Sequence, residues 1–183
     1  MDQASNRYNE AFKAFAKKYN IQLMEAEENS AISELNQLNN YQQTIFLKYY
    51  RIVTLNNQFM EALNGQNVAA AKTLQTQLLQ ATEQTLKSLR AMPPFKEDSS
   101  YRDAAIKFIE LINSLSKEGY TKMIQMLEKP DTQRTQEDVN QYNNVITQLQ
   151  EKLPQLDQSV QTASSELLKK FVPKPDARPA KRL

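Results

Sequence analysis

Apolar residues recur every three or four positions through most of this chain, and the first long run of this kind begins near residue 35. Steps that alternate between three and four residues place such positions on one face of an α-helix. The run consists of Leu35, Leu38, Gln42, Ile45, Tyr49, Ile52, Asn56, Phe59 and Leu63. A flanking row of Phe46, Val53 and Met60 predicts a buried face wide enough for a helical bundle. We expect this helix to end at Asn64-Gly65, with Gly65 in a left-handed cap.

Three further runs have the same periodicity. They contain Val68, Ala71, Leu74, Leu78, Leu79, Thr82, Leu86, Leu89 and Met92; then Tyr101, Ala105, Phe108, Ile112 and Leu115, continued past Gly119 by Met123, Ile124 and Leu127; and last Val139, Tyr142, Ile146, Leu149, Leu153, Leu156, Val160, Ala163, Leu167 and Phe171. Lys129-Pro130-Asp131 ends the third helix, and Thr135 with Asp138 predicts a capping box at the start of the fourth. Because the periodicity continues through Pro154, we expect a kink there and not a break.

Four long helices with short links predict an all-α fold, an antiparallel up-down-up-down four-helix bundle. The bundle covers residues 21–171. Residues 1–20, with Tyr8, Phe12, Phe15 and Tyr19, form an extra amphipathic helical segment that either packs on the bundle or extends its first helix. Residues 172–183 form a basic, proline-rich tail whose composition predicts disorder.

The segment Met92-Pro93-Pro94-Phe95-Lys96-Glu97-Asp98-Ser99-Ser100-Tyr101-Arg102-Asp103 divides the helical sequence in two. Adjacent prolines end a helix at Met92, because they remove backbone donors and disfavour the helical region in the preceding residue. Ser99 or Ser100 is expected to cap the next helix, with Asp98 and Asp103 near its positive end.

Composition excludes several classes of function. The 183 residues contain no Cys and no His and only two glycines, which removes thiol and imidazole catalysis, zinc sites and glycine-rich phosphate loops. The net charge of +2 comes from Lys and Arg spread among Asp and Glu, so nucleic acid is not the expected partner. We therefore expect no enzyme, no catalytic residue, no cofactor and no metal. No stretch of sequence is apolar enough to cross a membrane.

Two groups on the first helix have alternative interpretations. Gln42 and Asn56 occupy apolar positions of the seam, where they either contact a ligand or set helix register or pair with each other across a layer, and the structural interpretation is favoured. Tyr41, Tyr49 and Tyr50 either line a groove for a ligand or form the edge of the core with their hydroxyls reaching solvent, which we favour.

Two carboxylate clusters and the tail are weaker candidates. Glu25, Glu27 and Glu28 form one cluster, and Glu97, Asp98 and Asp103 form the other. Paired acids can perform acid–base chemistry or bind calcium, but neither cluster has the spacing of a calcium loop, and helix capping explains the second. The basic tail is interpreted as solvated, with anionic lipid or nucleic acid as the alternative.

The best candidate for a binding surface is the central turn, with Pro94, Phe95, Lys96, Asp98 and Arg102. It would combine an exposed aromatic ring, both charges and a rigid backbone, as recognition loops do. The alternative is a structural turn, since the same residues also explain a helix cap and a helix start.

The stretch Leu86-Lys87-Ser88-Leu89-Arg90-Ala91-Met92-Pro93-Pro94-Phe95-Lys96-Glu97-Asp98-Ser99-Ser100-Tyr101-Arg102-Asp103-Ala104-Ala105-Ile106 resembles a family of uncharacterised surface lipoproteins of Gram-negative bacteria. In that family a Phe-Lys-Gly-Asp-Ser-Ser turn precedes a Leu-Arg-Asp-Ala-Ala helix start. This chain has Glu97 in place of the glycine and Tyr101 in place of the leucine. Glycine accepts a positive φ at little cost and glutamate does not, so the geometry of the turn is the point to examine.

The resemblance implies an exported, lipid-anchored helical bundle with no known enzymatic activity. We therefore expect a binding or scaffold module of the cell envelope, periplasmic or on the outer-membrane surface, whose partner is an unknown protein or envelope component. Membrane contact would be only through an N-terminal lipid anchor absent from this chain. The polar start Asp2-Gln3-Ala4-Ser5-Asn6 is compatible with a mature exported protein and equally with a chain that has no signal. The alternative is a soluble intracellular or secreted helical adaptor or chaperone that binds a partner protein.

Overall fold

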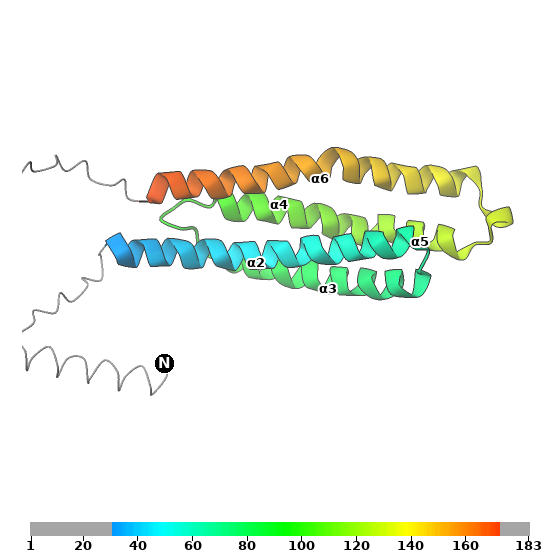
Figure 1. The fold of residues 1–183 in the computed structure, drawn as a ribbon, viewed down its shortest axis with the longest axis horizontal. Coiled ribbons are helices and arrows are strands. Elements are labelled where there is room, and N and C mark those ends of the chain that lie inside the picture. The colour runs from blue at the N-terminus through cyan, green and yellow to red at the C-terminus, as the bar shows by residue number, and fades with distance from the viewer. Residues whose placement is uncertain (1–30, 173–183) are drawn as a thin grey trace, which may run out of the picture. The chain divides into compact units, whose positions relative to one another are not determined.

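The computed structural model describes residues 31–172, and these are all-α, as the sequence predicts (Figure 1). The helices are α2 (Ala31–Asn64), α3 (Val68–Ala91), α4 (Ser100–Ser114), α5 (Tyr120–Glu128) and α6 (Gln136–Phe171). A π-helical turn, η1 (Leu115–Gly119), joins α4 to α5, and a 3₁₀ turn, η2 (Asp131–Gln133), lies between α5 and α6. No β-strand occurs within residues 31–172. The segment 1–20 and the tail after Val172 lie outside the described residues.

Most helix ends lie where the sequence places them. The capping box at the start of α6 is confirmed, since the Asp138 backbone N–H donates to the Thr135 hydroxyl (3.2 Å) and the Thr135 N–H donates to the Asp138 carboxylate (2.9 Å). Helix α3 ends one residue before Met92, and α5 ends one residue before Lys129. Prolines immediately after these two positions explain both ends.

The turn between α2 and α3 corrects one expectation. Gly65 does not have a positive φ; the left-handed residue is Gln66, with φ of 53°. The Asn67 N–H donates to the Ala62 carbonyl (2.8 Å) and the Gln66 N–H to the Leu63 carbonyl (2.9 Å). This is the bonding of a Schellman motif with Gln66 in the position that glycine usually takes, one residue later than predicted.

The third helical run continues past Gly119 as expected, but through a π-helical turn that the periodicity did not predict. The Gln75 side chain of α3 donates to the Ser116 carbonyl (2.8 Å) and to the Thr121 hydroxyl (2.7 Å), so it satisfies a carbonyl in the altered turn. Gly119 lies against α6, where a Cβ atom would be 2.9 Å from Cγ2 of Val145. The glycine is therefore required by close packing and not by its backbone angles.

Helix α6 continues through Pro154 without a break. Proline removes one backbone hydrogen bond and crowds the preceding turn, and Figure 1 shows the axis of α6 bending in its middle. Of the helical face predicted for α6, Leu149, Val160 and Leu167 are buried. Val145 is buried as well, although the prediction named its neighbour Ile146, which is half-buried. Its first apolar position is an exception, because Val139 is exposed.

The core belongs to the compact unit that begins at Gln37. Within this unit α4 packs on α3 and α6, α5 packs on α3 and α6, and Figure 1 shows these helices running alongside α2. The Phe59 ring of α2 stacks on the Tyr120 ring of α5 at 4.2 Å between centroids. The largest fully buried side chains are Tyr120, Phe59, Leu38, Ile45, Ile52, Leu63, Leu78, Leu89, Ile109, Ile112, Met123 and Leu167.

Candidate functional site

The central turn, proposed from the sequence as the binding surface, is built around a buried ring. Phe95 is only 8% exposed, so the expectation of an exposed aromatic here is wrong. Its ring lies 5.6 Å from that of Tyr41 on α2 and 5.2 Å from that of Phe171 on α6. Phe95 fills the space between the beginning of one helix and the end of another, and this packing explains its burial.

The backbone of this turn is tight. The Phe95 N–H donates to the Asp98 carbonyl (3.0 Å), and the Asp98 N–H donates to the Phe95 carbonyl (2.8 Å). The two residues between them, Lys96 and Glu97, have φ of 46° and 71°. Two consecutive positive φ values are the pattern of a type I′ turn, which favours glycine at its second central position. Glu97 therefore adopts a backbone region that glycine occupies at lower cost.

Asp98 ties the turn to two helices. Its carboxylate accepts from the Ser100 N–H (3.0 Å) and hydroxyl (2.6 Å) and from Nζ of Lys170 on α6 (2.7 Å). The bond from Lys170, with those from Ser100, lowers the pKa of Asp98 to about 2. The predicted serine cap is corrected here: Ser99 makes no capping bond, and its hydroxyl donates to Asp103 (2.6 Å).

Arg102 and the remaining residues of the turn complete this arrangement. The guanidinium of Arg102 donates to the Met92 carbonyl at the end of α3 (2.6 Å) and forms an ion pair with Asp103 (2.9 Å). Pro94 and Lys96 are exposed, and the Lys96 ammonium lies 6.0 Å from the Phe171 ring centroid. The turn brings the five predicted residues together, but Phe95, Asp98 and Arg102 are engaged in internal contacts. These contacts favour the structural alternative.

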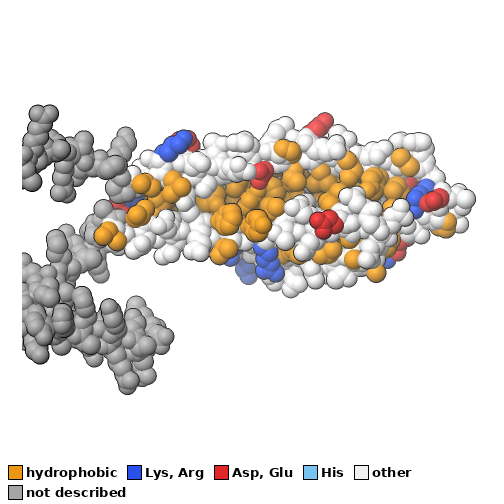
Figure 2. All heavy atoms as spheres, viewed as in Figure 1, with side chains coloured by type: hydrophobic (Ala, Val, Ile, Leu, Met, Phe, Trp, Pro, Cys, Tyr) orange, Lys and Arg blue, Asp and Glu red, His pale blue; other side chains and the backbone are white. Residues whose placement is uncertain are grey.

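A groove between α2 and α6 is the more open surface. This apolar groove has a volume of about 450 Å³ and is lined by Phe46, Tyr49, Tyr50, Val53, Tyr101, Asp157, Val160, Gln161 and Ser164. Figure 2 shows hydrophobic side chains gathered over α2 and between α2 and α6. The groove thus collects apolar and aromatic side chains from three helices, with a few polar groups at its edge. Such a composition is typical of a ligand or partner site.

Phe46 and Tyr50 form the exposed wall of the apolar groove. Their rings stack at 5.6 Å between centroids, and they are 49% and 55% exposed. Phe46 was predicted to lie in the buried face of the helix. This prediction is wrong, because no helix of the described residues covers that side of α2. Leu47, next to Phe46, is 58% exposed. The apolar periodicity identified the helix but not how much of its circumference is covered.

Tyr49 forms the base of the apolar groove. Its hydroxyl donates to Asp157 of α6, which also accepts from the Gln161 side chain (2.6 Å). Burial and the hydrogen bond to Asp157 raise the pKa of Tyr49. Tyr49 and Tyr50 thus line a groove, while Tyr41 is buried beside Phe95, so the expectation of tyrosine hydroxyls in solvent is wrong for Tyr41 and Tyr49.

The two polar residues of the α2 seam each bond to another helix and not to each other. The Gln42 side chain donates to the Ser164 carbonyl of α6 (2.9 Å). Asn56 is buried and accepts from the Tyr120 hydroxyl of α5. Both interactions agree with the register interpretation.

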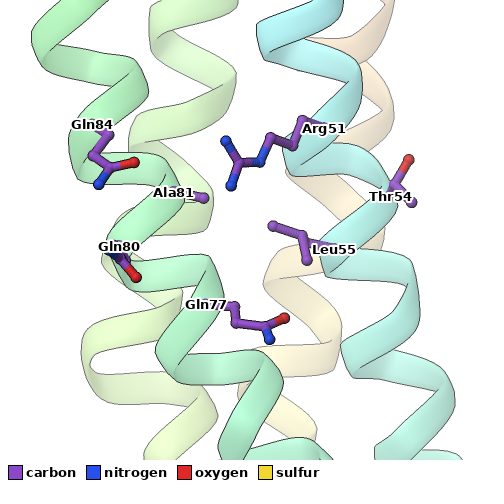
Figure 3. A pocket seen from close by; sticks show the side chains of 7 residues that line it. All are labelled: Arg51, Thr54, Leu55, Gln77, Gln80, Ala81 and Gln84. Atoms are coloured by element: carbon purple, nitrogen blue, oxygen red, sulfur yellow. The ribbon is translucent and has the colours of Figure 1, made fainter.

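A second groove lies on the other side of α2, facing α3 (Figure 3). This polar groove has a cavity of about 520 Å³, and a second cavity of about 230 Å³ shares Arg51 and Gln84 with it. Its lining residues are Leu47, Lys48, Arg51, Thr54, Leu55, Gln77, Gln80, Ala81, Gln84 and Thr85. Figure 3 shows the Arg51 side chain reaching from α2 into the space between the two helices. Sequence analysis did not single out this groove.

The carboxylate clusters show no catalytic geometry. Glu25, Glu27 and Glu28 lie outside the described residues, and Asp98 and Asp103 are bound as described above. Within residues 31–172 no group of three or more acidic side chains could hold a metal ion. In the same part of the chain no helix has the length and apolarity needed to cross a membrane.

Comparison with known proteins adds no relative: no protein-family model, curated protein or solved structure matches this chain.

The positive φ at Glu97 gives a testable prediction. Replacing Glu97 by glycine should stabilise the protein by about 1 kcal/mol, because a side chain in the left-handed region costs about that much more than glycine. The change would be measured as a higher urea midpoint at an unchanged slope.

Glu151→Gly is the matched control, since Glu151 is an exposed glutamate inside α6. There glycine should destabilise by about 1 kcal/mol. A Glu97→Gly protein no more stable than the parent would contradict a left-handed backbone at this position.

Proposed function

We propose that this protein is a non-enzymatic binding module that holds an apolar segment of a partner protein in the apolar groove. The observation that carries this proposal is the stacked pair Phe46 and Tyr50, both half exposed on one wall of the groove. Burying an aromatic side chain of this size contributes about 1.5–3 kcal/mol. Exposed aromatic rings gathered beside a preformed groove are the usual sign of a binding surface.

The internal hydrogen bonds and ion pairs of the acidic side chains support a role without catalysis. The sequence contains no His and no Cys, so acids, hydroxyls and lysine amines are the groups left for acid–base or nucleophilic chemistry. Asp98 is held ionised by Lys170, and Asp157 is occupied by Tyr49 and Gln161. Both carboxyls are engaged in these contacts and the pKa of Asp98 is lowered, whereas a general acid needs a raised pKa and an open approach.

We propose that the helices form an antiparallel up-down-up-down bundle, which would hold α2 rigidly between its two grooves. Contacts between helices support this arrangement. Gln42 of α2 bonds to Ser164 of α6, and Tyr49, seven residues later in α2, bonds to Asp157, seven residues earlier in α6. In the same way, Lys117 pairs with Glu83 of α3, and Glu128, eleven residues after Lys117, pairs with Lys72, eleven residues before Glu83. The paired residues run in opposite directions in both cases, as antiparallel helices require.

The 183 residues contain no cysteine, so this arrangement is testable by cross-linking of introduced cysteines. A protein with Gln42→Cys and Ser164→Cys should be joined efficiently by a short bis-maleimide, which gives a faster-migrating band on a denaturing gel. The pair Gln42→Cys and Gln141→Cys should not be joined, because Gln141 lies at the opposite end of α6. Preferred cross-linking of the second pair would contradict the antiparallel arrangement.

We also propose a location in the cell envelope with a lipid anchor, which rests on the family resemblance of the central turn alone. Mass spectrometry of the protein isolated from its own cells tests it. We expect a lipid-modified N-terminal cysteine upstream of residue 2. An unmodified protein beginning at Met1 would contradict the lipid anchor and favour the soluble adaptor.

The binding function can be tested with a neutral amphipathic peptide. The probe is a fluorescein-labelled helical peptide of 18 residues with leucine on one face and glutamine elsewhere. It should bind the full chain with a dissociation constant below about 1 mM, measured by fluorescence anisotropy. Phe46→Ser together with Tyr50→Ser should weaken binding at least about tenfold, because the exposed wall of the groove is lost.

Val139→Ser is the control, since Val139 is an exposed apolar residue of α6 that does not line the groove. It should leave the anisotropy titration unchanged. Circular dichroism checks that each variant keeps its helical content. Equal binding by the groove variant and the parent would refute the proposed site.

A further inference from the structure

Helix α2 carries a groove on each side, and the two grooves differ in chemistry. At 100° per residue, Phe46, Tyr49, Tyr50 and Val53 face one side, while Lys48, Arg51, Thr54 and Leu55 face the other. Phe46, Leu47 and Tyr50 are exposed and form an apolar ridge between the two grooves. A partner segment that lies along this ridge therefore contacts the apolar groove with one edge and the polar groove with the other.

The polar groove is cationic and carries no acid. Among its lining residues Lys48 and Arg51 are the charged ones, and the others that are polar are neutral amides and hydroxyls. In α2 (residues 31–64) the acidic residues are Glu34 and Glu61, both several turns away. Carboxamide and guanidinium groups together supply many N–H donors, and carboxylates accept such donors well.

Arg51 differs from the other arginines of residues 31–172 in having no acidic partner, and Lys48, one turn away, has none either. Arg90 pairs with Glu110 at 2.7 Å and Arg134 pairs with Asp131 at 2.6 Å. Lys48 and Arg51 form no ion pair with any residue in the range 31–172. Two unpaired cations one helical turn apart, beside a ridge of exposed apolar side chains, are complementary to a surface with both carboxylates and apolar groups.

We infer that the partner of this protein is an acidic amphipathic segment of a protein, which places apolar side chains in the apolar groove and carboxylates against Arg51 and Lys48 in the polar groove. This inference rests on the proposed function and adds the charge of the partner. An α-helix with side chains is about 10 Å across, so a helix on the ridge presents different faces to the two grooves. Polyanions such as nucleic acids or polyuronates lack the apolar face that Phe46, Leu47 and Tyr50 require.

The test compares two peptides that differ only in charge. The first is the neutral leucine–glutamine peptide described above, and the second has glutamate at every glutamine position facing Arg51 and Lys48. The full chain should bind the glutamate peptide about tenfold more tightly at low salt, as measured by fluorescence anisotropy. Added sodium chloride should reduce this preference, because it screens exposed charges.

Variants of the chain separate this inference from the proposed function. Arg51→Gln with Lys48→Gln should abolish the preference for the glutamate peptide and leave binding of the neutral peptide unchanged. Phe46→Ser with Tyr50→Ser should weaken binding of both peptides. Lys122→Gln, an exposed lysine of α5 outside both grooves, is the matched control and should change neither.

Four results would overturn the inference. Equal binding of both peptides by the parent would leave the apolar site standing and remove the acidic partner. Displacement of the bound glutamate peptide by polyglucuronate at a lower concentration than by unlabelled peptide would identify a polyanion. Sedimentation that shows a dimer sensitive to Arg51→Gln would identify a second copy of this chain. If neither peptide binds, both the proposed function and this inference fail.

Discussion

The surface of this protein depends on the register of α2, and polar contacts to two other helices set that register. Gln42 bonds to Ser164 and Tyr49 to Asp157 on α6, while Asn56 bonds to Tyr120 on α5. A buried polar group that loses its partner costs about 1–3 kcal/mol, so a shift of α2 by one turn would lose all three contacts together. Apolar packing alone would tolerate such a shift better, because similar side chains recur along the seam. These contacts therefore decide which α2 residues face outward.

Two aromatic residues have the opposite burial from that predicted, each for a different reason. Sequence reasoning placed Phe46 in the core and Phe95 on the surface, whereas Phe46 is half exposed and Phe95 is 8% exposed. Periodicity shows which face of a helix is apolar but not how many neighbours cover it, and α2 is covered over less than its apolar width. A phenylalanine in a turn has no period at all, and only the positions of Tyr41 and Phe171 determine its burial.

Predictions from local sequence were more accurate for helix ends, where a few neighbouring residues determine the backbone geometry. The capping box at Thr135 and the helix ends before Pro93 and Pro130 follow from backbone chemistry that needs no distant partner. The left-handed residue at the end of α2 was misplaced by one position, since Gln66 and not Gly65 takes it. Helix packing can extend a helix by a residue and move its cap, and this depends on contacts that are distant in sequence.

The candidate site was harder to predict than the fold, because it depends on which charged side chains have no ion-pair partner in the folded protein. Gln77, Gln84 and Arg51 are unremarkable in the sequence, and they share one groove only because α2 and α3 lie side by side. Several charged residues near helix ends within residues 31–172 form internal ion pairs, as Asp98 and Lys170 do. Lys48 and Arg51, in the middle of α2, have no such partner among the described residues, and their ion-pairing capacity is left for another molecule.

The chemistry of the two grooves also limits the affinity that a partner can reach. Full burial of an aromatic side chain contributes about 1.5–3 kcal/mol. Phe46 and Tyr50 are 49% and 55% exposed, so a partner that covers them gains about half of this for each, and an exposed ion pair adds about 0.2–1 kcal/mol. Loss of translational and rotational freedom opposes binding by about 4–15 kcal/mol. A partner that contacts only this ridge is therefore held weakly, and a tight complex would require contacts that extend beyond the two grooves. Lys48 and Arg51 contribute more to the orientation and choice of the partner than to its affinity. They favour the orientation in which the acidic edge of a partner helix, and not its neutral edge, lies in the polar groove.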